Sequence, residues 1–175
     1  AEVVTDVRAS LWHKFVGLTV NSALTSLVRQ PAGVVYPHPD LMALAGAGFA
    51  ETAAVGRAKG VKLPEDIVEW QVKNHLGFPA GMYASMYHDL VRGKRLELES
   101  LSGLVAREGR KLGIPTPFHS MAYACLKPYA NNPQGYGRMA ITRGFAECEQ
   151  PVVQMLREMQ QKRMEYIAED GDEWL

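Results

Sequence analysis

Three polar side chains on otherwise apolar helical segments have the chemistry needed to act on a small oxo-acid. Lys14 follows Trp12 in an apolar stretch, Ser85 opens the polar block 85–89 (Ser-Met-Tyr-His-Asp), and Glu97 lies beyond that block. A lysinium near a carbonyl oxygen stabilises the alkoxide charge that develops during reduction and donates a proton to it. Nothing in the chain could supply electrons, so these residues predict half of an active site.

Motifs for other chemistries are missing from the sequence. It contains no HExxH, no paired CxxC, no Walker-type GxxxxGK[ST] and no GxSxG. Residues 135–140 fit GxGxxA, but an Asn-Pro-Gln loop precedes them in place of the strand that a dinucleotide fingerprint requires. The five histidines share no metal-ligand spacing. We therefore expect no nucleotide site and no metal site in this chain.

Composition favours one globular domain with small-molecule or protein partners. The chain has 175 residues, of which 47% are hydrophobic and 22% charged, enough for a single core. Nineteen basic residues balance nineteen acidic ones. A net charge of zero gives no general attraction to nucleic acid or to anionic membranes.

Targeting features point to the cytoplasm. The longest apolar run, residues 41–50, is about half the roughly 20 residues that a membrane span needs. The N-terminus resembles no signal peptide and lacks an initiator Met, so we expect a chain cut from a longer one. Cys125 and Cys148 lie in helix-like segments without ligand spacing. Free thiols in a reducing cytoplasm are the expectation for both.

Hydrophobic periodicity is helical almost throughout and predicts an all-α fold. The first helix should run from Val7 to Val28 with Asp6 as its N-cap, and Gly60 should end the second helix. The expected later helices are a third opening at Pro64 and stopping near Gly77, a fourth from Met82 to Val91, a fifth from Leu96 to Leu112 and a sixth from Phe118 to Tyr129.

The last part of the chain, residues 131–175, differs in character. An Asn-Asn-Pro-Gln-Gly linker precedes an amphipathic helix that should begin near Pro151. The apolar face of such a helix indicates that it packs against another surface but does not identify that surface. It could dock on residues 1–130 of its own chain or on a second subunit.

The polar residues form part of a longer series of signatures. In order along the chain these are Trp12-His13-Lys14, the block at 85–89, the Gly-Lys-Arg-Leu-Glu-Leu-Glu run at 93–99, Gly103, and the Gly-Ile-Pro-Thr-Pro stop at 113–117. Together they resemble the C-terminal domain of the ketopantoate reductase (2-dehydropantoate 2-reductase) family over roughly residues 6 to 130. Glu51, followed by Gly60-Val61, resembles the family's second helix and its exit.

This resemblance implies a compact helical domain of the 6-phosphogluconate-dehydrogenase-like type. In the family it closes over the substrate against an N-terminal Rossmann domain that binds NADPH, and the enzyme converts 2-dehydropantoate to pantoate for pantothenate and coenzyme A biosynthesis. The chain looks like the helical half alone, without the Rossmann domain. We therefore expect a substrate-binding, catalytic domain that is inactive in isolation.

Roles for single residues follow from the same resemblance. Lys14 matches the lysine that donates the proton, and Ser85 matches the serine that holds the substrate carboxylate. Glu97 matches the glutamate that lies near the lysine, the substrate and the cofactor ribose, which makes it a candidate for both catalysis and cofactor binding.

The helix of Lys14 departs from the family pattern. Asparagines usually stand four and eight residues after the lysine, where this chain has Leu18 and Ser22. Asn21, seven residues after Lys14, lies nearly in line with it and could fill one polar role, so Asn21 and Ser22 are candidate substrate ligands. An amide replaced by leucine leaves a polar substrate group unpaired, at a cost of roughly 1 to 3 kcal/mol. The sequence therefore predicts the reduction of a 2-oxo acid but does not identify which 2-oxo acid is the substrate.

Two functions fit these observations. The first is the catalytic domain of an NADPH-dependent 2-oxo-acid reductase, with its own Rossmann domain as partner and a homodimer as a compatible assembly. The second is a non-catalytic dimerisation or binding module derived from such a reductase. A strand, GxGxxG and helix encoded upstream of Ala1 would distinguish the enzyme from the module.

Overall fold

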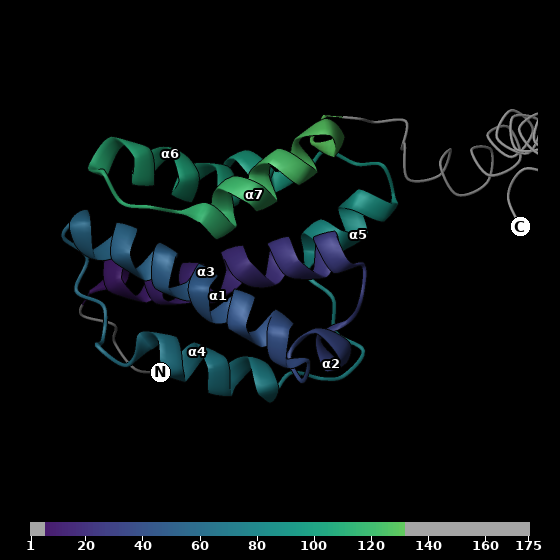
Figure 1. Ribbon diagram of the computed structural model, residues 1–175, viewed down its shortest axis with the longest axis horizontal. Helices are drawn as coiled ribbons and strands as arrows, with labels where there is room; N and C mark the ends of the chain where they lie inside the picture. Colours follow the sequence, from purple (N-terminus) through teal and green to yellow (C-terminus); the bar gives the residue numbers. More distant parts are fainter. Residues whose placement is uncertain (1–5, 132–175) are drawn as a thin grey trace, which may run out of the picture. The chain divides into compact units, whose positions relative to one another are not determined.

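The computed structural model describes residues 6–131, and these are helical (Figure 1). The helices are α1 (Val7–Val28), α2 (Ala32–Val35), α3 (Pro39–Ala58), α4 (Ile67–Leu76), α5 (Ser85–Val91), α6 (Ser102–Leu112) and α7 (Pro117–Leu126), with 3-10 turns η1 (Glu97–Glu99) and η2 (Lys127–Tyr129). Residues 6–131 contain no strand, which confirms the all-α prediction. The expected helix near Pro151, the GxGxxA sequence and Cys148 lie outside the described residues.

Helix α1 has the bounds that its sequence predicts. The Asp6 side chain accepts a hydrogen bond of 2.9 Å from the Ala9 amide and so caps the first turn. Arg29, in the left-handed conformation at φ 55°, ends the helix. Nearly every residue from Val16 to Ser26 is buried, because α3, α4, α5 and α7 surround this half of the helix. The half before Val16 is much more exposed.

Three helix starts differ from the prediction. Helix α4 begins at Ile67 because Pro64 forms a turn in which its carbonyl accepts from the Ile67 amide. Helix α5 begins at Ser85, because Met82 takes part in a loop in which its carbonyl accepts from the Ala32 amide. The helix expected from Leu96 to Leu112 is divided at Leu101, whose backbone (φ −102°, ψ −107°) is not helical.

Two hydrophobic clusters meet along α1. The larger lies between α1, α3, α4 and α7 and includes the fully buried Val20, Phe49 and Ile67. The smaller joins α5, η1 and the end of α7 around Met86 and Leu98. In Figure 1, α6 and α7 lie on one side of the α1–α3 layer and α4 lies on the other. Among the described helices, none is both long and apolar enough to cross a bilayer.

A buried polar cluster joins α3 to the start of α7. The Glu51 carboxylate accepts hydrogen bonds from the amides of Phe118 (2.8 Å) and His119 (3.1 Å), so a side chain of α3 caps the N-terminus of α7. Burial raises the pKa of Glu51, and the two amide hydrogen bonds oppose that rise. The imidazole Nε2 of His119 lies 2.7 Å from Thr52 Oγ1, and Nδ1 lies 3.3 Å from Ser102 Oγ.

His119 should make the fold acid-sensitive. Burial lowers its pKa from 6.5 to about 4, so below pH 6.5 the unfolded chain binds a proton that the folded chain does not. The free energy of unfolding should therefore fall by about 3 kcal/mol as the pH drops from 6.5 to 4. Burial also lowers the pKa of His75, which likewise reduces the free energy of unfolding as the pH falls. The raised pKa of Glu51 has the opposite effect on the free energy of unfolding.

Urea unfolding of the wild type and of His119→Gln between pH 4 and pH 7 measures this contribution. The glutamine variant should be less stable at pH 7 but should lose less stability on acidification. Equal pH dependence in the two proteins would exclude His119 as the source.

Gly33 fixes the loop that precedes α5. Its amide donates to the Ala80 carbonyl at 3.0 Å, and a Cβ added at Gly33 would lie 2.7 Å from Ala80 Cα. Gly33→Ala should therefore lower the free energy of unfolding by about 1–3 kcal/mol, measured by chemical denaturation. Gly81→Ala, in the same loop, is the matched control because open space surrounds its added methyl group. A Gly33 variant as stable as the Gly81 variant would contradict the close approach.

Candidate active site

Lys14, Leu18 and Asn21 share one face of α1. Their spacing of four and three residues places the side chains one above the other along the helix. Lys14 is exposed, Leu18 is 37% exposed and Asn21 is 5% exposed, so the face passes from solvent into the protein. This face carries the predicted proton donor Lys14, the apolar Leu18 and the amide of Asn21.

A cavity of about 320 Å³, here called the α4 cavity, lies beside this face. It is lined from α1 by His13, Lys14, Gly17, Leu18 and Asn21, from α4 by Trp70, Gln71, Asn74 and His75, and from the following loop by Phe78 and Met82. The structure therefore brings Lys14 and Asn21 to one cavity. Its size falls in the range of small-molecule sites.

Close packing of α1 on α4 sets the wall of this cavity. A Cβ at Gly17 would lie 2.4 Å from the Gln71 side-chain oxygen and 2.9 Å from the His75 ring, so a larger residue would displace these side chains. The Gln71 amide nitrogen donates to the His13 carbonyl at 2.8 Å. These contacts hold α4 against the turn of α1 that carries Lys14.

Asn21 lines the α4 cavity, and within residues 6–131 its side-chain NH₂ group forms no hydrogen bond. Its Oδ1 accepts from the Tyr36 hydroxyl at 2.8 Å, and burial raises the pKa of that hydroxyl. Because the carbonyl oxygen is occupied in this way, the amide NH₂ is the group left to bind a ligand. Lys14 and Asn21 thus present a cation and a neutral donor, the groups that recognise a carboxylate or an oxo group.

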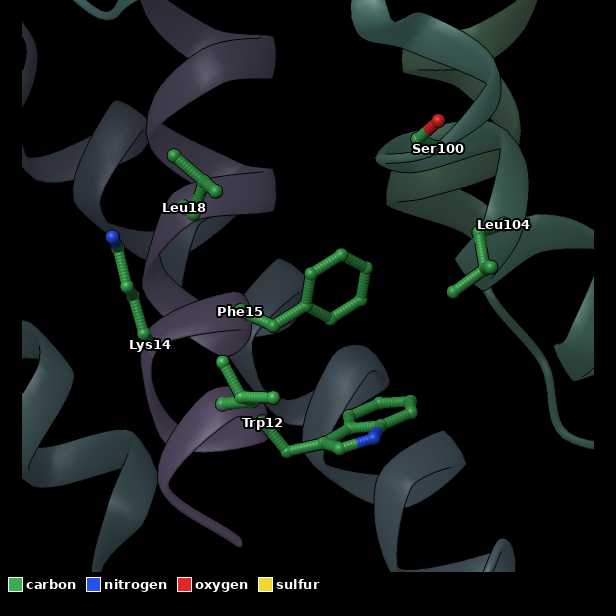
Figure 2. A pocket seen from close by; sticks show the side chains of 7 residues that line it. Trp12, Lys14, Phe15, Leu18, Ser100 and Leu104 are labelled. Atoms are coloured by element: carbon green, nitrogen blue, oxygen red, sulfur yellow. The ribbon is translucent and has the colours of Figure 1, made fainter. Parts of the chain in front are cut away.

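A second cavity of about 470 Å³, the α6 cavity, lies on the other side of Lys14 (Figure 2). Trp12 and Phe15 extend toward Ser100 and Leu104, while Lys14 points away from them. The Trp12 and Phe15 rings meet edge to face at 5.2 Å. Besides Lys14, the hydrogen-bonding groups among the lining side chains are the Ser100 hydroxyl and the Trp12 indole N–H, so the cavity offers no second charge to orient an acid.

Ser85, Glu97 and Ser22 line neither cavity. Ser85 is the exposed first residue of α5, three residues after Met82, and Glu97 is the exposed first residue of η1. Within residues 6–131, no ion pair joins Lys14 to Glu97. Ser22 is fully buried, and its hydroxyl has no hydrogen-bond partner among the described atoms. Their roles in the site stay predictions.

The turn that carries Glu97 is held by its neighbour Glu99. The Glu99 carboxylate pairs with Arg107 at 2.6 Å, accepts from the Tyr123 hydroxyl at 2.8 Å and also pairs with Lys127. The hydrogen bond from Lys127 is the main cause that lowers the pKa of Glu99 to about 2. Glu97 is therefore displayed from a fixed turn.

Sequence reasoning did not find the contribution of α4. Trp70 and Asn74 are four residues apart, as are Gln71 and His75, so all four lie on neighbouring rows of one helix face. The amides of Gln71 and Asn74 beside the Trp70 ring were the sequence feature that could have indicated a binding surface. Without the fold, nothing in the sequence links this helix to Lys14.

Comparison with known proteins agrees with this architecture. The family model described as "Ketopantoate reductase PanE/ApbA C terminal" matches residues 6–130. A 2-dehydropantoate 2-reductase of Caulobacter vibrioides is 30% identical over 128 residues, which cover 73% of this chain and 43% of the relative. A second family model, for erythromycin esterase, matches residues 119–175, less than half of the chain.

Solved structures give the same result. A PanE/ApbA family ketopantoate reductase from Ralstonia eutropha has a TM-score of 0.68 at 32% identity, covering 74% of this chain and 43% of that one. A dimeric ketopantoate reductase from Staphylococcus aureus has a TM-score of 0.67 at 27% identity, covering 73% and 44%. The chain thus spans less than half the length of these relatives. With a helical fold and a match that runs from the start of α1 to the end of η2, the chain belongs to the ketopantoate reductase family and corresponds to its C-terminal domain.

Proposed function

We propose that this chain is the substrate-binding and catalytic domain of an NADPH-dependent 2-oxo-acid reductase. The observation that carries the proposal is the joint lining of the α4 cavity by Lys14 and Asn21 in a chain of this family. A lysinium and an amide donor beside a cavity of substrate size can hold a 2-oxo acid by its oxygens. The relatives named above as 2-dehydropantoate 2-reductases support this reaction class.

Lys14 acts on the substrate oxygen. NADPH, when bound, would supply the hydride that reduces the carbonyl carbon. As negative charge gathers on the carbonyl oxygen, the Lys14 ammonium stabilises it and transfers a proton, which leaves a 2-hydroxy acid and a neutral amine. The Asn21 amide keeps the substrate oriented while this happens.

Ser85 and Glu97 complete the proposed site. Ser85 binds the substrate carboxylate through its hydroxyl, and Glu97 orients Lys14 and would be the residue of this chain that holds the ribose of a bound cofactor. Both are exposed at the starts of short elements, where a second domain can reach them. The described helices offer no strand-turn-helix unit for a dinucleotide, so we assign NADPH binding to an N-terminal Rossmann domain. A homodimer is proposed by analogy with the dimeric Staphylococcus aureus enzyme.

Replacing Lys14 tests the proposal. In the whole protein with its Rossmann domain, Lys14→Ala should lower kcat for 2-oxo-acid reduction by about 10²- to 10⁴-fold, because the variant lacks the proton donor. NADPH oxidation followed at 340 nm gives the rate. The isolated 175-residue chain should show no turnover.

Two variants make this measurement specific. Lys62→Ala removes an exposed lysine that lines neither cavity and should keep wild-type turnover. Lys14→Arg keeps the charge but holds its proton too tightly, so it should remain slow. Wild-type turnover in Lys14→Ala would exclude the proposed donor, and a whole protein that reduces no 2-oxo acid would refute the reductase assignment.

A further inference from the structure

The lining of the α4 cavity mixes hydrogen-bonding side chains with apolar ones. Lys14 and Asn21 supply the donors, whereas Leu18, Phe78 and Met82 line the cavity without any hydrogen-bonding side-chain group apart from the weak thioether sulfur. A 2-oxo acid bound by its carboxylate and oxo oxygens therefore places the rest of the molecule against carbon.

The other amides of the cavity do not change this division. Gln71 is 2% exposed, and its NH₂ group is used in the hydrogen bond to the His13 carbonyl. Its oxygen lies against Gly17. Asn74 is solvent-exposed and stays hydrated without a ligand. Neither residue offers a buried, unused partner for a hydroxyl group on the substrate chain.

Two pairs of aromatic rings line the cavity, each formed by an apolar ring and a histidine. Trp70 is 45% exposed and meets the His13 ring edge to face at a centroid distance of 4.4 Å. Phe78 packs on His75, also at 4.4 Å, with the rings tilted by 41°. A half-exposed tryptophan beside a cavity leaves apolar surface that a ligand ring can cover, and aromatic pairs contribute beyond their buried area.

Leu18 excludes a polar chain at the position nearest the donors. It stands one helical turn from Lys14 and one from Asn21, lines the cavity and is 37% exposed to solvent. A substrate hydroxyl placed against its side chain would lose a hydrogen bond to water and gain none. An apolar substituent would instead bury the leucine.

From this division we infer that the site selects 2-oxo acids with an aromatic or other bulky apolar side chain, with Leu18 and Trp70 as specificity-determining residues. The inference rests on the proposed reductase function and names its substrate class. Phenylpyruvate represents this class, 2-dehydropantoate represents hydroxylated acids, and 2-oxobutyrate represents small ones.

The test is kcat/KM for these three acids in the whole protein with NADPH. The wild type should prefer phenylpyruvate over 2-dehydropantoate by about tenfold or more. Leu18→Asn should narrow that ratio by about tenfold, because the new amide can pair with the hydroxyl. Trp70→Ala should raise KM for phenylpyruvate by about tenfold with kcat little changed. For 2-oxobutyrate, kcat/KM should stay within about twofold of the wild-type value.

Two matched controls locate the effect. Leu76→Ala removes another exposed apolar side chain of α4, one that does not line the cavity, and it should not alter the preference for phenylpyruvate. Leu11→Ala alters the α6 cavity instead. A change in preference with Leu11→Ala and none with Trp70→Ala would overturn the assignment to the α4 cavity.

The outcomes separate the two proposals. Reduction of 2-dehydropantoate with equal or better kcat/KM than phenylpyruvate overturns the substrate class and leaves the reductase function standing. No reduction of any of the three acids overturns both. Preference for phenylpyruvate that disappears in Leu18→Asn and Trp70→Ala supports the inference.

Discussion

The burial of the second half of α1 is the constraint on which the rest of the structure depends. From Val16 to Ser26 the helix is enclosed by four others, and both hydrophobic clusters contact it. This enclosure fixes the rotation of the whole helix, because an α-helix does not twist independently along its length. The exposed first half is therefore held with Lys14 at a set angle between α4 and α6.

Small residues and capping groups support that arrangement. Gly17 allows α4 to approach α1, and Glu51 on α3 caps α7 from a distance in sequence of 67 residues. Neither contact is strong alone. Each fixes the spacing of one pair of helices, and the cavity beside Lys14 is a product of those spacings.

The sequence was sufficient for much of the fold. Periodicity and capping predicted α1 with its bounds, and Gly60 and Gly113 mark helix ends with positive φ. Local sequence signals predicted the wrong helix start where tertiary contacts determine it. Met82 was expected to begin a helix, but its carbonyl accepts a hydrogen bond from the Ala32 amide and lies in a loop. For the site, Lys14 and Asn21 were predicted to share a face and do so. The α4 wall was not predicted, because residues far apart in sequence are brought together only by packing.

Leu18 lines both cavities at once. One side of its isobutyl group borders the α4 cavity, where we propose that substrate binds, and the other borders the apolar α6 cavity. During divergence within the family, a mutation at this position alters two surfaces in a single step. A polar side chain at position 18 would therefore face Phe15 and Leu104 in the apolar α6 cavity as well as the proposed substrate site.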